Sequence, residues 1–335
     1  MLDHRKHTLG GPVRNIAVAF VLVLALGACG GRTSGDGAGG KPGTIRVALV
    51  CGGMTPLTAQ IAINAKTFPD GLKVKKLCFD SGSEAVQALI GGSLDVFMGS
   101  TEHILSTRAQ GLPTKGYAGI NNRAPYSLIT AVDSDVKSVA DLKGETVAVT
   151  SPGSLADTEL QLAAKENSVA YDSMKVIGAG SGSTMASAIS RGQVAAGMVS
   201  EPQQSELLQS GDYRVVWEPE FEFASIVAVA NSEWVAKNKV TMRAFFEGLS
   251  TAANKAKKDN SFAVTTMQDE DFPVSEKALT SAVKDGLTRV PENLVISKEV
   301  YTNTTDLLAS VEGLKKSEVA PYDEVFDFSF LPESP

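Results

Sequence analysis

The chain has 335 residues, of which 43% are hydrophobic, 21% charged and 6% aromatic, and its formal net charge is −7. This length suggests about two domains and a core that needs no metal or disulfide scaffold. The first 28 residues carry a net charge of +2, from Arg5, Lys6 and Arg14 against Asp3, so the remainder carries −9. An acidic body with few aromatic residues lacks the basic stripes and stacking platforms that nucleic acid requires, so we exclude nucleic acid as a partner.

The N-terminus has the pattern of an export signal. Its three cations precede an unbroken apolar run at 16–26. That run is too short for a bilayer core, which takes about 20 residues, but it fits the apolar region of a signal peptide. We therefore expect residues 1–28 to be a signal peptide.

The signal ends in Leu26-Gly27-Ala28-Cys29, which resembles the lipobox of bacterial lipoproteins. In that family the chain is cut before the cysteine, whose sulfur then carries a diacylglycerol. The glycine-rich residues 29–43 are expected to form a flexible tether. The resemblance implies an extracytoplasmic protein that is anchored to the bacterial cell membrane by lipid on Cys29. An ordinary secretory signal followed by an incidental cysteine is the alternative.

Two cysteines remain once Cys29 is assigned to the lipid. Cys51 and Cys78 fall near the ends of expected strands that should be neighbours. An even number of cysteines outside the cytoplasm is compatible with a disulfide between them. Two buried thiols are the alternative, and the sequence leaves both open.

A repeat with an offset of 100 residues organises the rest of the chain. The segment 81–102 aligns without a gap with 181–202, and 44–58 aligns with 144–158. Each copy has β-branched runs, glycine-containing turns and helical patterns in the order strand, helix, strand, helix, strand. The expected strands are 45–51, 73–79 and 94–98 in the first copy and 145–150, 174–178 and 195–199 in the second. The expected helices lie at 55–66, at 154–166 and after Ser83 and Ser183, which we assign as helix N-caps.

Strands that alternate with helices predict parallel sheets with helices on both faces. The two copies therefore predict an α/β fold of two similar lobes, each a mainly parallel sheet, with a ligand cleft between the lobes. We assign 44–122 plus 224–335 to lobe I and 123–223 to lobe II, connected through 119–128 and 217–228. The last third of the chain is expected to cover the sheet of lobe I. Its expected elements are a strand at 225–230 and helices at 232–238, 241–258, 275–289 and 297–312.

The candidate ligand-binding residues lie in the turns that follow the strands. In open α/β sheets, ligands bind outside the carboxyl ends of the strands. Glycines there allow a close approach, and helix N-terminal N–H groups and hydroxyls favour an anion or a polar acceptor. From the first lobe we expect Gly53, Met54, Thr55, Ser81, Ser83, Ser100 and Thr101 to bind the ligand. From the second lobe we expect Ser151, Ser154, Ser181, Ser183 and Glu201.

One cation lies near an expected connection between the lobes. Arg123 stands beside two asparagines and could bind a sulfonate, nitrate or carboxylate through both of its terminal nitrogens. A surface arginine at a hinge is the alternative. Three aromatic residues could form apolar walls at the hinge or pack elsewhere: Tyr126, Phe221 and Phe223.

Several of these segments together resemble the solute-binding proteins of ABC importers, in particular the nitrate, sulfonate, taurine and thiamine-pyrimidine group. The resemblance spans about 44–230 and rests on Gly52-x-x-x-Pro56-Leu57, Ser81-Gly82-Ser83-Glu84-Ala85, Gly99-Ser100-Thr101-Glu102, Asp141-Leu142-Lys143-Gly144 and Glu201-Pro202. It implies a type II periplasmic-binding fold that clamps a small solute between two lobes. It also implies a monomer whose partners are the permease and ATPase subunits of an importer.

An enzyme is the alternative class. After the signal peptide a single histidine, His103, remains, so no histidine pair can bind zinc. The glycine-rich run at 180–184 lacks the lysine of a phosphate-binding loop. Some relatives of this fold are desulfinases or pyrimidine synthases, so a Cys51–His103 dyad is conceivable, although His103 also fits an exposed helix residue. We predict a binding protein without catalytic residues, cofactor or metal.

Overall fold

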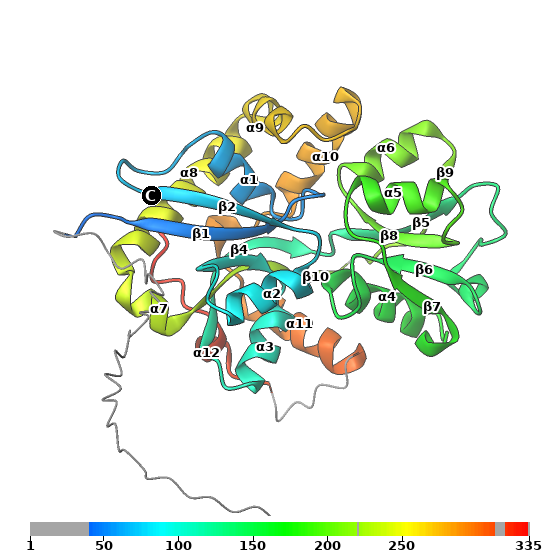
Figure 1. Ribbon diagram of the computed structural model, residues 1–335, viewed down its shortest axis with the longest axis horizontal. Helices are drawn as coiled ribbons and strands as arrows, with labels where there is room; N and C mark the ends of the chain where they lie inside the picture. Colours follow the sequence, from blue (N-terminus) through cyan, green and yellow to red (C-terminus); the bar gives the residue numbers. More distant parts are fainter. Residues whose placement is uncertain (1–39, 220, 312–318, 334–335) are drawn as a thin grey trace, which may run out of the picture. The chain divides into compact units, whose positions relative to one another are not determined.

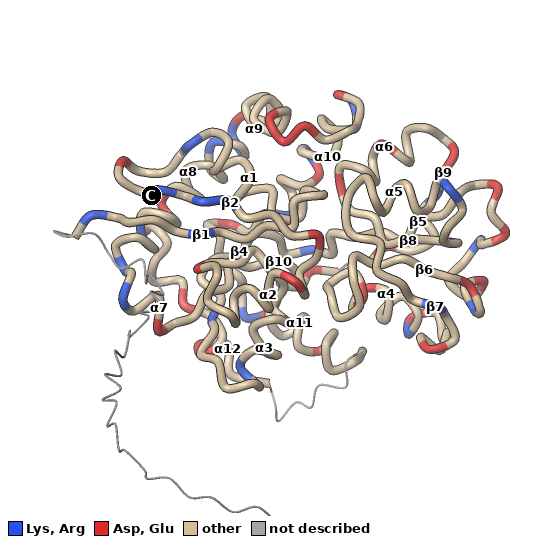
Figure 2. Tube along the Cα trace, in the orientation of Figure 1, with Lys and Arg blue, Asp and Glu red and all other residues tan. Residues whose placement is uncertain are grey.

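The computed structural model describes residues 40–219, 221–311 and 319–333. The expected signal peptide, Cys29 and most of the expected tether lie outside these residues. Within these ranges, no helix is both long enough and apolar enough to cross a membrane. Two five-stranded sheets organise the described chain (Figure 1). Acidic and basic residues are interspersed along the described helices and turns (Figure 2).

The first sheet has the strand order β2-β1-β3-β10-β4. Its strands are β1 (Thr44–Val50), β2 (Lys73–Phe79), β3 (Val96–Gly99), β4 (Thr114–Arg123) and β10 (Glu222–Asn231). Strand β1 is parallel to β2 and β3, whereas β10 is antiparallel to both β3 and β4. Four strands therefore point in one direction, and their carboxyl ends meet at one edge, as the sequence predicts for a mainly parallel sheet.

The second sheet repeats this plan with the order β7-β6-β8-β5-β9. Its strands are β5 (Tyr126–Ala131), β6 (Thr146–Val149), β7 (Lys175–Gly178), β8 (Ala196–Ser200) and β9 (Tyr213–Trp217). Here β5 is the antiparallel strand, in the place that β10 has in the first sheet. The predicted α/β fold of two lobes is thus confirmed.

The 100-residue repeat extends to the pairing register of the strands. In both sheets the first strand of the copy lies between the second and the third, and equivalent residues face each other. The facing residues are Val47 with Lys76 and Val96, and Val147 with Val176 and Ala196. A shift of 100 therefore maps one set of pairs onto the other, so equivalent turns follow equivalent strands in the two lobes.

Helices cover both faces of each sheet. The repeat supplies α1 (Leu57–Asn64), α2 (Gly82–Ile90) and α3 (Thr101–Ala109) in the first lobe and α4 (Leu155–Glu166), α5 (Ser183–Ser190) and α6 (Gln203–Ser210) in the second. The last third adds α7 (Ser232–Lys237), α8 (Lys239–Lys258), α9 (Asn260–Met267), α10 (Glu276–Thr288), α11 (Lys298–Val311) and α12 (Tyr322–Val325). Helices α8 and α9 pack on α1, whereas α11 packs on β10 and α12 on β4 (Figure 1). The C-terminal helices thus cover the first sheet, as predicted.

Alternating side chains of β1 separate the two cores of the first lobe. Val47 lies in the core that contains Ile61 of α1 and Phe246 of α8. Its neighbour Ala48 lies in the other core, with Leu308 of α11. This alternation is the normal consequence of strand geometry, and it leaves the carboxyl end of β1 free to present its turn to the second lobe.

The helix N-caps differ from the sequence prediction. Ser81, not Ser83, caps α2: its backbone is extended, and its Oγ accepts a hydrogen bond from the backbone N–H of Glu84 at 3.3 Å. Ser83 lies inside the first helical turn. In the second lobe Gly182 precedes α5 with φ of +60°, and Ser183 is the first helical residue. The spacing Ser81-x-x-Glu84 is a known N-terminal signature and could have identified the correct cap.

The expected connecting segments are mostly strands. Strand β4 continues to Arg123 and β10 starts at Glu222, so in the described chain the connections between the sheets are short, at 124–125 and between Trp217 and Glu222. The expected lobe boundaries fall beside these connections and stay a prediction. Strand β4 escaped prediction because it contains two glycines: a Cβ on Gly116 would lie 2.7 Å from Phe326, and one on Gly119 would lie 2.6 Å from Ile296. These glycines accommodate C-terminal side chains from far along the sequence.

A disulfide joins Cys51 and Cys78 at the ends of β1 and β2. The strands are direct neighbours in the first sheet. In the second lobe the equivalent positions are Ser151 and Gly178, so the covalent link exists in one lobe only.

Replacing both cysteines by serine is expected to lower the free energy of unfolding by about 3–4 kcal/mol, because 27 residues separate them and the disulfide restricts the unfolded chain. Urea unfolding of the oxidised protein and the double variant measures this difference. The oxidised protein treated with reductant is the control and should unfold with the variant. Equal stability of the oxidised protein and the variant would contradict the expectation.

Candidate functional site

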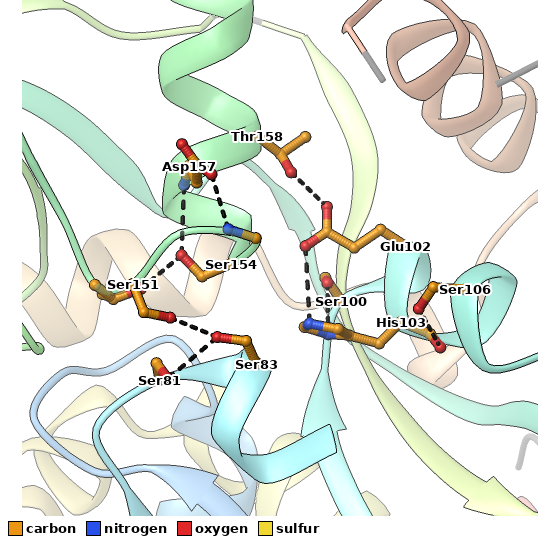
Figure 3. A network of polar contacts seen from close by, with 12 residues as sticks. Ser81, Ser83, Ser100, Glu102, His103, Ser106, Ser151, Ser154, Asp157 and Thr158 are labelled. Atoms are coloured by element: carbon orange, nitrogen blue, oxygen red, sulfur yellow. Dashed lines mark hydrogen bonds and ion pairs between the residues drawn. The ribbon is translucent and has the colours of Figure 1, made fainter. Parts of the chain in front are cut away.

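Polar side chains from the two lobes meet where the strand-end turns face each other. Figure 3 shows this group, which we call the serine patch. Its members from the first lobe are Ser81, Ser83, Ser100, Glu102 and His103, and from the second lobe Ser151, Ser154, Asp157 and Thr158. Five of these nine residues belong to the set expected from the sequence.

Two hydrogen bonds in the serine patch cross between the lobes. Ser83 Oγ bonds directly to Ser151 Oγ. Thr158 Oγ1 donates to Glu102 Oε2 at 2.8 Å (Figure 3). Because Ser83 does not cap its helix, its hydroxyl is available to the other lobe. The two turns therefore bind each other directly in this structure.

The turn before α4 is held by its own side chains. Ser154 caps α4 through the N–H of Asp157 and also accepts from Thr150 Oγ1 at 2.8 Å. Asp157 in turn accepts from the N–H of Gly153 at 2.8 Å and from the hydroxyl of Tyr171. A carboxylate in the first turn is favourable for a helix. Ser154 and Asp157 therefore fix the shape of the turn that presents Ser151.

His103 is buried, not exposed as the sequence suggested. Its ring lies 5.5 Å from that of Phe97, its Nδ1 lies 2.9 Å from Ser100 Oγ, and its Nε2 lies 3.9 Å from Glu102 Oε1. Burial lowers the pKa of His103 to about 4, so the imidazole is neutral at pH 7. The turn after β3 folds the ring under α2, which a helical pattern alone does not reveal.

Glycines permit a second contact between the lobes. A Cβ on Gly52 would lie 2.2 Å from Ser181 Oγ, and one on Gly182 would lie 2.1 Å from the carbonyl oxygen of Gly52. A Cβ on Gly53 would lie 2.5 Å from Ser200 Oγ. Next to these glycines, the N–H of Met54 donates to the carbonyl oxygen of Glu201 at 2.7 Å. Only residues without side chains at these positions allow the turns to approach so closely.

Two further cavities lie beside this contact. The larger, of about 550 Å³, is lined by both connections between the sheets and by α6 and α10; we call it the hinge cavity. Its lining includes Arg123, Tyr126, Glu201, Glu218, Asp285 and Arg289. A smaller one, of about 20 Å³, shares three of these residues and adds Met54 and Thr55. Of the expected aromatic walls, Tyr126 contributes to the lining, whereas Phe221 and Phe223 contact each other with ring centroids 5.5 Å apart.

Both arginines that line the hinge cavity form ion pairs within the protein. Arg123 is half-exposed, and its guanidinium lies 3.6 Å from Glu222. Arg289 lies 2.6 Å from Asp285 and donates to the carbonyl oxygen of Ala124 at 2.5 Å. Arg123 therefore lies at the hinge, which is one of the two alternatives that the sequence left open. Glu222 already balances its charge.

A buried carboxyl group lies behind Tyr126. Glu159 of α4 is fully buried, and its Oε2 accepts from the N–H of Tyr126 at 3.2 Å. Burial raises the pKa of Glu159 well above its usual value; the charge of Glu102 raises it further, and Arg289 opposes this. Burial likewise raises the pKa of Glu201. The cleft thus contains two carboxyl groups, Glu159 and Glu201, whose negative charge is not fully stabilised by nearby cations or hydrogen-bond donors.

Two expected residues lie apart from the rest. Ser183 is exposed and lines a surface groove with Arg191 on the second lobe. Thr101 is buried, and its hydroxyl donates to the carbonyl oxygen of Ala224 at 2.7 Å, within the first lobe. The remaining expected residues lie in the serine patch, at the glycine contact or beside the cavities.

Sequence reasoning missed several acidic and basic residues of the site, including Glu218 and Asp285 of the hinge cavity. Glu102 and Asp157 occupy first helical turns directly after strand-end turns, and that position was a usable signal. Glu159 lies one residue further along α4, where nothing in the local sequence distinguishes it. Arg289 comes from the C-terminal third and reaches the cleft only through the packing of α10.

Comparisons with solved structures place this fold among known proteins. A protein of Bordetella bronchiseptica RB50 matches with a TM-score of 0.77 and 23% identity, covering 86% of this chain and 95% of that one. The alkanesulfonate-binding protein SsuA from Xanthomonas axonopodis pv. citri, bound to MOPS, matches with a TM-score of 0.68 and 18% identity, covering 82% and 96%. A DszB mutant in complex with biphenyl-2-sulfinic acid matches with a TM-score of 0.59 and 16% identity, covering 86% and 97%.

These likenesses show the shared two-lobed fold, and the sequence comparison shows the family. A search of the curated proteins finds no match. The model of the NMT1/THI5-like family matches residues 69–262, which is more than half of the chain and includes strands of both sheets. The chain therefore belongs to the NMT1/THI5-like family.

Proposed function

We propose that this protein is the solute-binding component of an ABC importer. It captures a small organic or oxyanion solute, of the nitrate, sulfonate, taurine or pyrimidine kind, between its two lobes and delivers it to the permease and ATPase subunits. Family membership and the likeness to SsuA support this proposal. The lipobox-like sequence that ends at Cys29 supports anchoring outside the cytoplasm by lipid.

The observation that carries the proposal is the direct contact between strand-end turns of the two lobes. Ser83 bonds to Ser151, and Met54 bonds to Glu201, with small residues at each point of approach. In the described chain two short connections join the sheets, one at 124–125 and one between Trp217 and Glu222. Short connections of this kind can absorb a hinge motion. A solute that enters the open cleft would replace these contacts when the lobes close around it.

Catalysis by a Cys51–His103 dyad is disfavoured by the partners of both residues. The sulfur of Cys51 is bonded to Cys78, so it offers no thiolate. His103 contacts Ser100 through Nδ1 and lies against Phe97. Binding therefore fits these residues better than nucleophilic chemistry does.

A thermal-shift screen of small solutes tests the proposal. A solute at 100 times its dissociation constant should stabilise the protein by about 2.7 kcal/mol. Calorimetry should then give one reversible site, and the solute should be recovered unchanged. Accumulation of a product would refute the proposal.

A side chain at Gly52 should hold the lobes apart. In Gly52→Ala the new Cβ would collide with Ser181, so we expect affinity for a solute found in the screen to fall at least ~10-fold. Unfolding of the solute-free protein should change little, because Gly52 lies outside both cores. Calorimetry and thermal unfolding measure the two effects. Gly91→Ala, at a helix end where the nearest atom is 3.4 Å away, is the matched control; equal affinities of the two variants would contradict the prediction.

Lipid on Cys29 should hold the protein in the membrane fraction of the cell. Cys29→Ser removes the sulfur that would carry the lipid, so the variant should leave the membrane fraction. Cell fractionation followed by immunoblotting measures this distribution. A serine variant that stays with the membrane would contradict lipid anchoring.

A further inference from the structure

The hinge cavity is lined by more negative than positive side chains. Among its described lining residues, four carry carboxylates, and two, Arg123 and Arg289, carry guanidinium groups. Each guanidinium already forms an ion pair, with Glu222 and Asp285 respectively. After this internal pairing, Glu201 remains as a carboxylate of the cavity without an ion-pair partner in the described chain, as does Glu218.

These two carboxylates have only neutral hydrogen-bond partners. Glu201 accepts from the backbone N–H and the Oγ of Ser205, each at 3.0 Å. Glu218 accepts from Ser127 Oγ at 3.3 Å. Neutral donors stabilise a carboxylate less than a cation does. The cavity therefore has space of about 550 Å³ next to negative charge that its own side chains do not balance.

An unsatisfied acceptor lies next to the same cavity. Tyr126 is part of the lining, and behind it Glu159 is fully buried, with an Oε1 that has no hydrogen-bond partner in the described structure. Leaving a buried polar atom unpaired costs about 1–3 kcal/mol. Glu159 itself is not among the lining residues, and its raised pKa favours the neutral acid, so the negative charge that a solute meets in the cavity comes from Glu201 and Glu218.

Two of the helix N-termini in the cleft, those of α3 and α4, are unfavourable for an anion. Such termini attract anions when their N–H groups are free. Here the first turn of α3 carries Glu102 and that of α4 carries Asp157, which accepts from the N–H of Gly153. At these two termini the chain's own carboxylates thus occupy the positions that an oxyanion would need.

From the cavity and its unbalanced carboxylates we infer that the solute is a nitrogen base that binds as its cation: an amine, an amidine or a guanidine. Its N–H groups donate to Glu201 and Glu218 in the hinge cavity. This inference rests on the proposed function, because it names the charge of the solute that the two lobes enclose. It selects against nitrate and sulfonates within the range of solutes that the family resemblance implies.

Two pairs of probes with similar shape and opposite charge test the inference. They are guanidinium with nitrate, and benzamidinium with benzoate, each titrated into the purified full chain by calorimetry. We expect each cation to bind at least ~10-fold more tightly than its anionic partner. Higher salt should reduce this preference, because it screens the carboxylates. An anion that binds as tightly as its cationic partner, or the absence of binding by both cations, overturns the inference.

Variants that replace a carboxylate with a neutral amide test where the cation binds. Glu201→Gln and Glu218→Gln keep the size and the acceptor oxygen of the side chain, and each should weaken the binding of benzamidinium at least ~10-fold. Glu276→Gln makes the same change at an exposed position of α10 and should leave binding unchanged. Equal binding by the Glu201, Glu218 and Glu276 variants overturns the assignment to the hinge cavity.

Failure of the inference and failure of the proposed function give different results. Reversible binding of an anion, with closure of the lobes seen by small-angle scattering, overturns the inferred charge but keeps a solute-binding protein. Conversion of a bound solute to product refutes the solute-binding function and the inference with it.

Discussion

The geometry of the cleft depends on how closely the strand-end turns of the two lobes approach each other. The carbonyl oxygen of Gly52 occupies the space that a side chain at position 182 would need, and Ser200 occupies the space beside Gly53. Because the backbones of the two lobes approach so closely, polar groups of the two lobes come within hydrogen-bond distance, as Thr158 and Glu102 show. The absence of side chains at the glycine turns thus allows the close approach of the strand-end turns in the cleft.

Close approach also removes water from charged groups, and this determines the electrostatics of the cleft. His103 responds to burial by becoming neutral, whereas Glu159 and Glu201 respond by holding their protons more tightly. Burial penalises the charged form in each case. Burial in the cleft thus favours the neutral form of all three groups.

The sequence predicted the scaffold well because the scaffold is built from local patterns repeated once. Strand runs, turn glycines and the 100-residue offset identify both sheets, and even the register follows the offset. The site was only partly predictable. Serines in turns such as Ser83 and Ser151 could be identified, but the burial of His103 and the roles of Glu159 and Arg289 depend on packing between distant segments. The residues that neighbour these positions in the sequence give no indication of such packing.

Because the two lobes share one scaffold, the side chains at equivalent positions distinguish their roles. Cys51 is bonded to the neighbouring strand, whereas its equivalent Ser151 bonds to the other lobe. Thr101 donates within its own lobe, whereas its equivalent Glu201 lines the hinge cavity. The duplicated backbone positions both turns alike and therefore does not select a solute. The copies differ at the cleft in both directions: Glu201 faces it in the second lobe, and Glu102, whose equivalent is Pro202, faces it in the first.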